Sequence, residues 1–443
     1  MALKSFKGGV HPYDGKELSK DKPIIDLMPG DELVFPLSQH IGAPAKAVVN
    51  VGDTVLRGQM IAESGGFVSS PIFSSVSGKV KALGKRRVAT GDMVDSIIIE
   101  NDYQEKEVEF NGMSLVDAME CETSEIIKKI SDSGVVGMGG AGFPTHVKLS
   151  PKDPEKIEYI IANCAECEPY LTSDYRTMLE NTEKLIGGMK ILVSLFPYAK
   201  GVFGIEDNKR DCIDLIAKEI ADDPKLSVCA LKTKYPQGGE RQLIHAVTER
   251  DINAKMLPAD AGCIVDNVAT ICAVYDAVVL GKPVMERVFT VSGENAKKPQ
   301  NYRIHIGTSF KEIFDEADGE KVPSEKYISG GPMMGFAMFD LMVPTTKTTS
   351  ALLCFEKDEA SLFPESACIN CGRCVDACPE NLIPSHLSKF FRNKQKEEFE
   401  KCYGLECIEC GSCTYVCPAK RSLAQDIKTY KRQIMAEKRN QKK

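Results

Sequence analysis

The pattern of hydrophobic and polar positions opens with short β-prone runs. Runs such as 45–49 and 60–63 are separated by Gly-Asp and Gly-Gln turns at Gly52-Asp53 and Gly58-Gln59. Short strands joined by turns at such close spacing predict a small β barrel or β sandwich.

Helices and apolar strands alternate between Leu115 and Gly281. Ser124 is suited to cap a helix that runs through Ile130. This alternation predicts a mainly parallel sheet covered by helices, and sites in such folds gather at the carboxyl ends of the strands. Strands are expected at 159–162, 201–205 and 228–232, and helices at 177–195, 211–220, after Gly239 and at 267–280.

Strands return beyond Lys282, at 287–293 and 302–307, and a short helix is expected at 310–316. Two strands and a helix indicate a small β-grasp-like module. The Thr- and Ser-rich stretch 345–353 is expected to link this module to the last part of the chain.

Composition narrows the class of protein. The 443 residues are enough for about three domains, and a net charge of −7 argues against nucleic acid as the main partner. The 17 cysteines, many of them in ligand-like spacing, favour a reducing compartment, the cytoplasm. The start of the chain lacks the apolar core of a signal peptide, and the best apolar candidate, 268–281, is short and contains Asp276. Membrane association is therefore expected to go through partners.

The pattern C-x2-C-x2-C-x3-C-P occurs twice near the end of the chain. It is typical of proteins with two 4Fe–4S clusters, in which the fourth cysteine of each run ligates the other cluster. This spacing favours iron–sulfur clusters over zinc sites or disulfides. The predicted ligands are Cys368, Cys371, Cys374 and Cys417 for cluster 1, and Cys407, Cys410, Cys413 and Cys378 for cluster 2.

A glycine-rich loop holds Gly137, Gly139 and Gly142 in a G-x-G-x-x-G pattern. The loop follows a predicted helix rather than a strand, so a flexible turn and a nucleotide site are about equally supported by the glycines alone. Exposed backbone N–H groups suit a phosphate or a flat ring system, and Lys148 would add a positive charge. The second glycine-containing stretch, 326–335, is better explained as a packed turn.

Three polar motifs fall where strands of the α/β region end: 163–169, 235–240 and 266–270. In 163–169, two carboxylates and an amide at a strand exit suit the hydroxyl groups of a ribose or ribityl chain, whereas the alternative is a solvated acidic loop. The motif 235–240 lies at the start of a helix, which favours anions, and 266–270 is another helix start with a capping residue. Cys164 and Cys167 are interpreted as packing thiols, because no second cysteine pair lies near them in sequence.

These motifs, in this order, resemble those of the flavin-binding subunit of respiratory complex I. With the barrel-like segment in front and the cysteine runs behind, the chain from Phe6-Lys7-Gly8-Gly9-Val10-His11-Pro12 to Pro418 resembles the C subunits of Rnf electron-transport complexes. The first segment is also similar to lipoyl and biotinyl carrier domains. Its hairpin tip, 63–66, lacks the modified lysine, so a structural or docking module is expected.

The resemblance implies a multidomain α/β fold. The expected domains are a barrel-sandwich (lipoyl-like) domain at 1–112, a Rossmann-like FMN/NADH domain at 113–284, a β-grasp domain at 285–345, an α-helical ferredoxin domain with two 4Fe–4S clusters at 346–425, and a basic tail at 426–443.

The resemblance also implies binding residues. Phe143 and Glu168 would contact NADH. Met138, Ala165 and Gly239 depart from the complex I pattern, in which arginine, aspartate and glutamate are usual. Non-covalent FMN would be held by Gly137, Gly139, Gly140, Lys148, Asn163, Glu166, Tyr235, Gly238, Glu240, Asp266 and Asn267.

The implied function is an NAD(H)-interacting electron-transfer subunit of a membrane-bound, ion-pumping ferredoxin:NAD oxidoreductase that transports Na+ or H+. NADH and FMN would exchange hydride without a catalytic acid–base residue, and two clusters would relay single electrons. The subunit would be peripheral, on the cytoplasmic face. Its partners would be other subunits, including an iron–sulfur subunit that exchanges electrons with ferredoxin. The alternatives are a soluble flavin iron–sulfur NADH dehydrogenase, a non-catalytic iron–sulfur relay, and a cobalamin- or quinone-dependent dehydrogenase.

Overall fold

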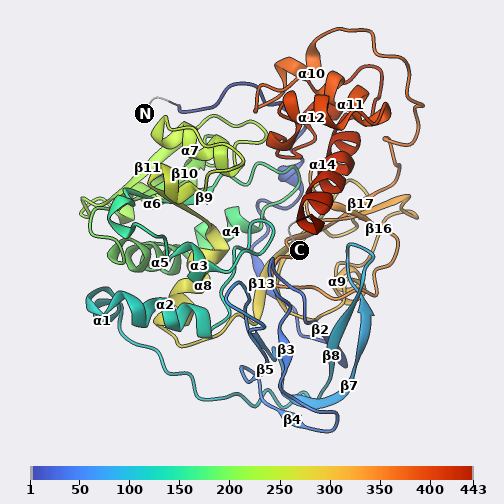
Figure 1. Ribbon diagram of the computed structural model, residues 1–443. Helices are drawn as coiled ribbons and strands as arrows, with labels where there is room; N and C mark the ends of the chain where they lie inside the picture. Colours follow the sequence, from blue (N-terminus) through green and yellow to red (C-terminus); the bar gives the residue numbers. More distant parts are fainter. Residues whose placement is uncertain (1–2, 442–443) are drawn as a thin grey trace.

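The computed structural model describes residues 3–441. Four modules follow one another along the chain: a β barrel, an α/β domain, a mixed-sheet module and a helical cluster domain (Figure 1). Four short 3-10 helices lie between the main elements, η1 (Lys16–Leu18), η2 (Pro154–Lys156), η3 (Pro258–Ala261) and η4 (Gly404–Glu406).

The barrel packs two antiparallel sheets around a common core. Alternate residues of its strands point inward, as Leu33 and Phe35 do, and this period of two is why the segment forms strands. The β structure expected for this segment is confirmed. One sheet has the order β2 (Glu32–Pro36), β8 (Met93–Asn101), β7 (Gly78–Arg87), β4 (Thr54–Val55), and the other β3 (Lys46–Ala47), β5 (Met60–Glu63), β6 (Ile72–Phe73).

The α/β domain contains the expected parallel sheet, with the strand order β11-β10-β9-β12. The strands are β9 (Tyr159–Cys164), β10 (Lys200–Glu206), β11 (Leu226–Leu231) and β12 (Cys263–Asn267). The helices are α1 (Leu115–Glu120), α2 (Thr123–Asp132), α3 (Thr145–Lys148), α4 (Ser173–Glu180), α5 (Thr182–Ser194), α6 (Arg210–Glu219), α7 (Glu240–Thr248) and α8 (Val268–Val278).

One helix of this domain differs from the sequence prediction. The single helix expected at 177–195 is two helices, α4 and α5, because Asn181 leaves the helical conformation with φ −126° and ψ 35°. Asn181 ends α4 and precedes α5, so the chain changes direction between them.

The mixed-sheet module is larger than the expected β-grasp insert. Its strand order is β1-β14-β13-β17-β15-β16. The stretch expected to be a linker contains β17, a buried apolar strand that pairs with both β13 and β15, and β1 comes from the segment before the barrel. The elements are β1 (Ile24–Asp26), β13 (Glu286–Ser292), β14 (Gln300–His305), α9 (Phe310–Glu316), β15 (Lys326–Ser329), β16 (Phe336–Met338) and β17 (Ala351–Phe355).

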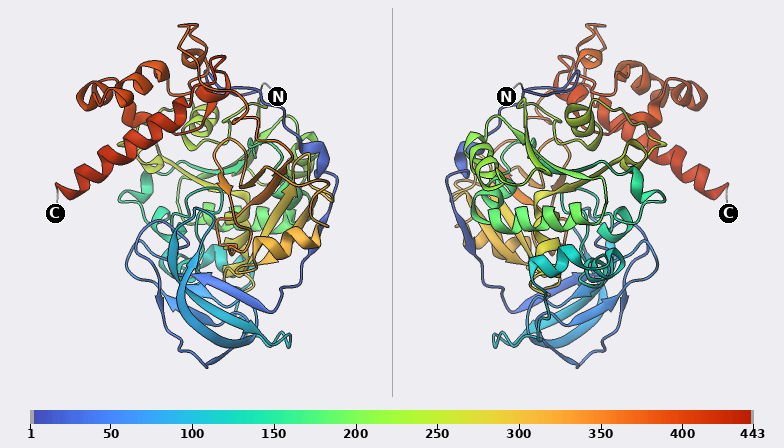
Figure 2. Two further views of the ribbon diagram at one scale, coloured as in Figure 1. Left: turned by 90° about the vertical axis from the view of Figure 1, so that its right-hand side faces the viewer. Right: turned by 90° about the vertical axis from the view of Figure 1, so that its left-hand side faces the viewer.

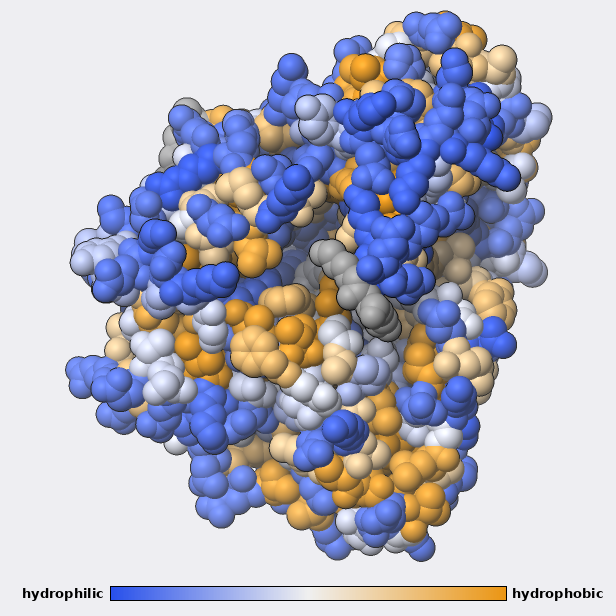
Figure 3. Space-filling model, viewed as in Figure 1, coloured by the Kyte–Doolittle hydropathy of each residue, from blue (hydrophilic) through white to orange (hydrophobic). Residues whose placement is uncertain are grey.

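The cluster domain consists of short helices around the cysteine runs and one long final helix. The helices are α10 (Arg373–Asp376), α11 (Pro384–Arg392), α12 (Lys396–Lys401), α13 (Ser412–Tyr415) and α14 (Leu423–Asn440). Residues 426–440 of the expected basic tail are part of α14, whose apolar face is buried at Ile427, Tyr430 and Ile434. Its other face is hydrophilic (Figure 3), and its C-terminal half extends away from the body of the protein (Figure 2). Residues 442–443 lie outside the described residues.

Among the described residues, no helix has the length and apolar character needed to cross a membrane.

Three of the four modules meet at the side chain of Lys347. This side chain is 1% exposed and comes from the mixed-sheet module, between β16 and β17. Its Nζ donates to Ser70 Oγ at 3.0 Å and to the carbonyl oxygen of Pro71 at 2.6 Å, both in the barrel, and to that of Gly134 at 2.7 Å in the α/β domain. Burial lowers the pKa of Lys347 to about 7.

We expect Lys347→Met to destabilise the protein by about 1–3 kcal/mol at pH 9, because two buried carbonyl groups lose their donor. The effect should be smaller at pH 6.5. The pKa of Lys347 in the folded protein lies below the ordinary value of 10.5, so between about pH 7 and pH 10.5 the unfolded chain binds more protons than the folded one. The contribution of Lys347 to the free energy of unfolding of the wild type therefore rises with pH across that range. Denaturant midpoints of the wild type and the variant at several pH values measure this difference in stability.

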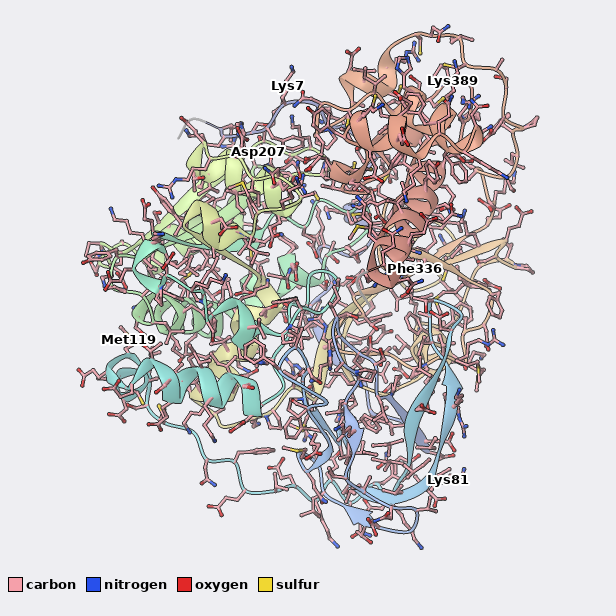
Figure 4. All side chains as sticks on the ribbon, in the orientation of Figure 1. Lys7, Lys81, Met119, Asp207, Phe336 and Lys389 are labelled. Atoms are coloured by element: carbon pink, nitrogen blue, oxygen red, sulfur yellow. The ribbon has the colours of Figure 1, made fainter. Side chains whose placement is uncertain are left out.

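Lys81→Met is the matched control, since Lys81 is an exposed lysine on β7 (Figure 4) that pairs with Glu32 across the barrel surface. It should change stability by less than about 0.5 kcal/mol at either pH. An unchanged pH dependence of stability in the Lys347 variant would contradict the assignment.

Candidate functional site

The candidate flavin site lies at the carboxyl ends of β9 and β12. These strands pair in parallel, and their register places Asn163 opposite Asn267. The glycine-rich loop packs against the start of α8, where Met138 N donates to Thr270 Oγ1 at 2.9 Å. A Cβ atom at Gly139 would lie only 2.8 Å from Asn267, whereas one at Gly140 would meet open space. The loop therefore forms a surface without side chains next to the polar strand ends.

A buried ion pair lies below this loop. Lys148 Nζ donates to Asp266 Oδ1 at 3.1 Å and to the carbonyl oxygen of Val265 at 2.8 Å. Burial opposes the charge on Lys148, but Asp266 and Glu240 outweigh it, so the pKa of Lys148 is raised and the amine stays charged. Burial raises the pKa of both carboxyl groups. A fixed positive charge thus faces the glycine loop, as a phosphate group requires.

The second polar motif closes the site from the side of α7. Asn163 Nδ2 donates to the carbonyl oxygen of Gly238 at 2.8 Å. Gln237, between Gly238 and the buried Tyr235, is 0% exposed, and neither polar atom of its side chain has a partner. Gln237 was not among the candidate site residues predicted from the sequence. Its position inside the 235–240 motif is the signal that points to it.

Glu166 is part of the site but its carboxylate is already engaged. Its Oε1 accepts from Asp174 N at 2.7 Å and its Oε2 from Tyr175 N at 3.1 Å, so Glu166 caps the start of α4. Asp174 in turn accepts from Asn267 Nδ2 at 2.6 Å. Burial and the charge of Glu166 raise the pKa of Asp174 to about 7. Nothing in the sequence pattern singled out Asp174.

The two residues predicted to contact NADH lie in different segments: Phe143 in the glycine loop, and Glu168 in the loop after β9, against residues 333–334. Phe143 is half-buried in the glycine loop, where its carbonyl oxygen accepts from Gly137 N at 2.8 Å. Glu168 accepts from the backbone N–H groups of Met333 and Met334, both at 3.0 Å. Burial raises the pKa of Glu168 to about 7. The packed turn expected at 326–335 therefore lies directly against this carboxylate.

The cysteine runs form two sets, each of which combines three cysteines of one run with the last cysteine of the other. Cys378 lies near enough to Cys407, Cys410 and Cys413 for the charges of these thiols to raise one another's pKa values. Burial is the main cause of their raised pKa values and brings that of Cys407 to about 12. The other set lines one small cavity of about 30 Å³ and consists of Cys368, Cys371, Cys374 and Cys417.

In the cluster 2 set, Cys378, Cys410 and Cys413 are buried and Cys407 is partly buried, whereas Cys368 and Cys371 of the cluster 1 set are exposed. Among residues 3–441, no three His, Cys, Asp or Glu side chains converge on a point suited to a single metal ion. Cys402 is exposed and lies outside both sets.

The flavin site and the cluster 2 set share a wall. The Tyr235 hydroxyl donates to the carbonyl oxygen of Cys410 at 2.7 Å. Arg241, in the first turn of α7, forms ion pairs with Glu380 at 2.6 Å and Glu406 at 3.1 Å, close in sequence to Cys378 and Cys407. The α/β domain and the cluster domain are thus joined by polar contacts beside both candidate sites.

The residues present fit FMN. The glycine loop leaves an open surface, Lys148 provides a positive charge, and several buried polar atoms lack partners. These atoms are Asp266 Oδ2, Gln237 Oε1, Gln237 Nε2 and Arg287 Nη1, the last on a buried guanidinium that donates through Nη2 to the Met138 carbonyl oxygen. Such unpartnered groups are costly unless a polar ligand satisfies them.

Comparison with known proteins agrees with this arrangement. Residues 4–104 match the model of the RnfC barrel sandwich hybrid domain, residues 130–276 that of the Nuo51 FMN-binding domain, and residues 367–421 that of the 4Fe-4S dicluster domain. These matches confirm the predicted fold class and the predicted FMN and 4Fe–4S cofactor domains.

Similar curated proteins span nearly the whole chain. The C subunit of the Na(+)-translocating ferredoxin:NAD(+) oxidoreductase complex of Acetobacterium woodii is 42% identical, with 98% of each chain covered. The C subunit of the proton-translocating complex of Clostridium ljungdahlii is 44% identical over 90% of this chain and 87% of its own. A solved structure of an NAD+-reducing NiFe hydrogenase aligns over 73% of this chain and 63% of its own, with 18% identity and a TM-score of 0.48.

Identity above 40% over almost the full length confirms the resemblance derived from the ordered motifs. The chain belongs to the family of C subunits of ion-translocating ferredoxin:NAD(+) oxidoreductase complexes.

Proposed function

We propose that this chain is the NAD(H)-interacting electron-transfer subunit of a membrane-bound ferredoxin:NAD oxidoreductase that transports Na+ or H+. When bound, FMN would exchange hydride with the nicotinamide and pass electrons singly to 4Fe–4S clusters, which is chemistry that belongs to the cofactors. The observation that carries the proposal is the shared wall, in which Tyr235 of the flavin site donates a hydrogen bond to Cys410 of the cluster 2 set.

The residues of the chain bind and orient the flavin. Gly137, Gly139 and Gly140 offer backbone N–H groups, and Lys148 neutralises the phosphate. The remaining proposed FMN contacts come from the three polar motifs, with Phe143 and Glu168 on the NADH side. We assign to the flavin Asn163, Glu166, Tyr235, Gly238, Glu240, Asp266 and Asn267.

The two cysteine sets differ in their distance from the surface, which supports an order of electron transfer. Three of the four cysteines of the cluster 2 set are buried, and the carbonyl oxygen of Cys410 accepts from Tyr235, whereas Cys368 and Cys371 of the cluster 1 set are exposed. Ile369, which is 66% exposed, lines the cavity of the cluster 1 set, and the chain segment before it exposes Leu362 and Phe363. We propose this face as the exit toward an iron–sulfur subunit of the complex that exchanges electrons with ferredoxin.

The proposal places the chain as a peripheral subunit on the cytoplasmic face of the membrane. The named relatives are subunits of larger complexes, one of which translocates Na+ and the other protons. Co-purification with membrane subunits separates this role from that of a soluble flavin dehydrogenase.

Cofactor analysis after anaerobic purification tests the proposal most directly. We expect about eight irons, about eight acid-labile sulfides and about one acid-released FMN per chain. Full iron content without flavin, combined with full NADH oxidation, would overturn the flavin assignment. A chain with clusters but neither flavin nor NADH oxidation would instead be a relay protein.

Cys417→Ser should disturb cluster 1, although Cys417 belongs to the run that supplies most of cluster 2. We expect loss of the electron paramagnetic resonance signal of cluster 1, with the cluster 2 signal retained. Cys402→Ser is the control, because Cys402 is an exposed cysteine outside both sets, and its spectrum should equal that of the wild type. Selective loss of cluster 2 would show that the ligands do not cross between runs.

Glu168→Gln should raise the apparent KM for NADH more than it lowers flavin content. With a pKa of about 7, the Glu168 carboxyl group ionises as pH rises through neutrality and then accepts better from ribose hydroxyls. The wild-type KM for NADH should therefore fall from pH 6 to pH 8, and the variant should lose this trend. Equal losses of flavin and of NADH affinity would argue that Glu168 only supports the fold.

A further inference from the structure

The motif Phe6-Lys7-Gly8-Gly9-Val10 is not explained by either candidate site. It lies in an extended segment, residues 4–10, which we call the strap. The strap starts beside the α/β domain and crosses to the cluster domain (Figure 1). Lys7 is exposed and points away from the protein (Figure 4), whereas Phe6 and Val10 on either side of the glycines are buried.

On the side of the α/β domain, the strap adds to the edge of the parallel sheet. Lys4 pairs in parallel with Leu231 of β11, donating to the Ala230 carbonyl oxygen at 2.9 Å. Farther along, Val10 and Tyr235 exchange two backbone hydrogen bonds of 2.8 and 2.9 Å. The strap is therefore fixed to the backbone of Tyr235, a proposed flavin contact.

On the side of the cluster domain, the strap touches the backbone of a proposed cluster ligand. Gly9 N donates to the Ala377 carbonyl oxygen at 3.0 Å. A Cβ atom at Gly8 would lie 2.7 Å from the Cys378 carbonyl oxygen, and one at Gly9 would lie 2.7 Å from the Tyr235 carbonyl oxygen. Both glycines have positive φ, +78° and +81°. Steric fit and backbone conformation therefore both require glycine at these two positions.

Two further contacts hold the strap in place. Lys234 Nζ donates to the carbonyl oxygens of Phe6 and of Gly8, the latter at 2.9 Å, and lies 3.9 Å from the centre of the Phe6 ring. Val10, Tyr235, Ala377 and Cys410 form one small apolar core. The strap thus packs against both the backbone of the flavin site and the backbone of the cluster 2 set, and we call this three-way contact the joint.

We propose that the strap is a positioning element that sets the distance between the flavin site and cluster 2. Gly8 and Gly9 are the positioning residues, and they act through Cys378 and Tyr235. The covalent connection between the two domains runs through the mixed-sheet module and the stretch 356–366, in which every residue except Asp358 is exposed. Their separation therefore depends on noncovalent contacts such as those of the strap. This inference rests on the proposed function, because it assigns flavin to the Tyr235 site.

The test is Gly8→Ala in the full chain with its cofactors. The added methyl group must displace the Cys378 backbone or the strap. We expect unchanged flavin content and unchanged NADH oxidation with ferricyanide, which accepts electrons at the flavin. We expect NADH-driven bleaching of the clusters, followed by stopped flow, to slow about tenfold or more, because small misplacements cost large factors in rate. The resonance signal of dithionite-reduced cluster 2 should also change, while that of cluster 1 stays constant.

Gly52→Ala is the matched control. Gly52 also has a positive φ, +97°, but a Cβ atom there meets nothing within 4 Å, so it carries the backbone strain without the contact. Lys7→Ala tests the exposed residue of the strap. Both variants should bleach their clusters at the wild-type rate, and equal slowing in Gly52→Ala and Gly8→Ala would overturn the proposal.

Lys234→Met provides a second route if Gly8→Ala does not fold. It removes the donor that holds the strap without adding bulk, and the same slowing with more rapid hydrogen exchange at Gly9 N is expected. Wild-type bleaching and wild-type exchange in this variant would contradict the positioning role.

Failure of the proposed function would look different: the wild-type protein would lack flavin, yet the cluster 2 spectrum would still respond to Gly8→Ala.

Discussion

The contact between the barrel, the α/β domain and the mixed-sheet module depends on one buried amine. Lys347 reaches from the mixed-sheet module into the contact between the barrel and the α/β domain, where three oxygen atoms surround its Nζ. No carboxylate is among them, so the cost of burying a charge is met by lowering the pKa rather than by an ion pair. The amine donates to both carbonyl groups and to the Ser70 hydroxyl oxygen. The glycine loop begins just beyond Gly134, so the same contact sets where that loop lies.

Two further buried lysines, Lys209 and Lys16, hold the loop that follows β9. Lys209 Nζ donates to the Ala165 carbonyl oxygen at 2.6 Å, and Lys16 Nζ to those of Glu168 at 3.1 Å and Leu171 at 2.6 Å. These contacts fix a backbone in which Glu166 has a φ of +47°, an unfavourable conformation for glutamate. The two lysines thus fix the backbone of the loop that bears Glu166 and Glu168 before any ligand binds. Less conformational entropy of this loop is then lost when a ligand binds.

Local chemistry was easier to predict from the sequence than long-range contacts. The 4Fe–4S domain and the parallel sheet of the α/β domain could be predicted because cysteine spacing and the alternation of strands and helices are visible in the sequence itself. β17 was missed because a five-residue apolar run after a Thr-rich stretch does not reveal that its partners are β13 and β15. Asp174 and Gln237 were missed as site residues because their role depends on burial, and burial is a property of the assembled fold. The function of Gly8 and Gly9 was likewise invisible, since the atoms that exclude a side chain there come from residues 235 and 378.

The strap also imposes an order on biosynthesis. Residues 4–10 leave the ribosome long before Ala377, Cys378 and Cys410, against which they pack. The edge of the α/β sheet can receive the strap early, but the joint cannot close until the second cysteine run has been translated and folded. The contacts of the strap beside the proposed flavin site are thereby completed only when the cluster domain folds. In a chain whose cysteine runs fail to fold, the strap would keep its contacts with the α/β domain and lack those with Ala377 and Cys410.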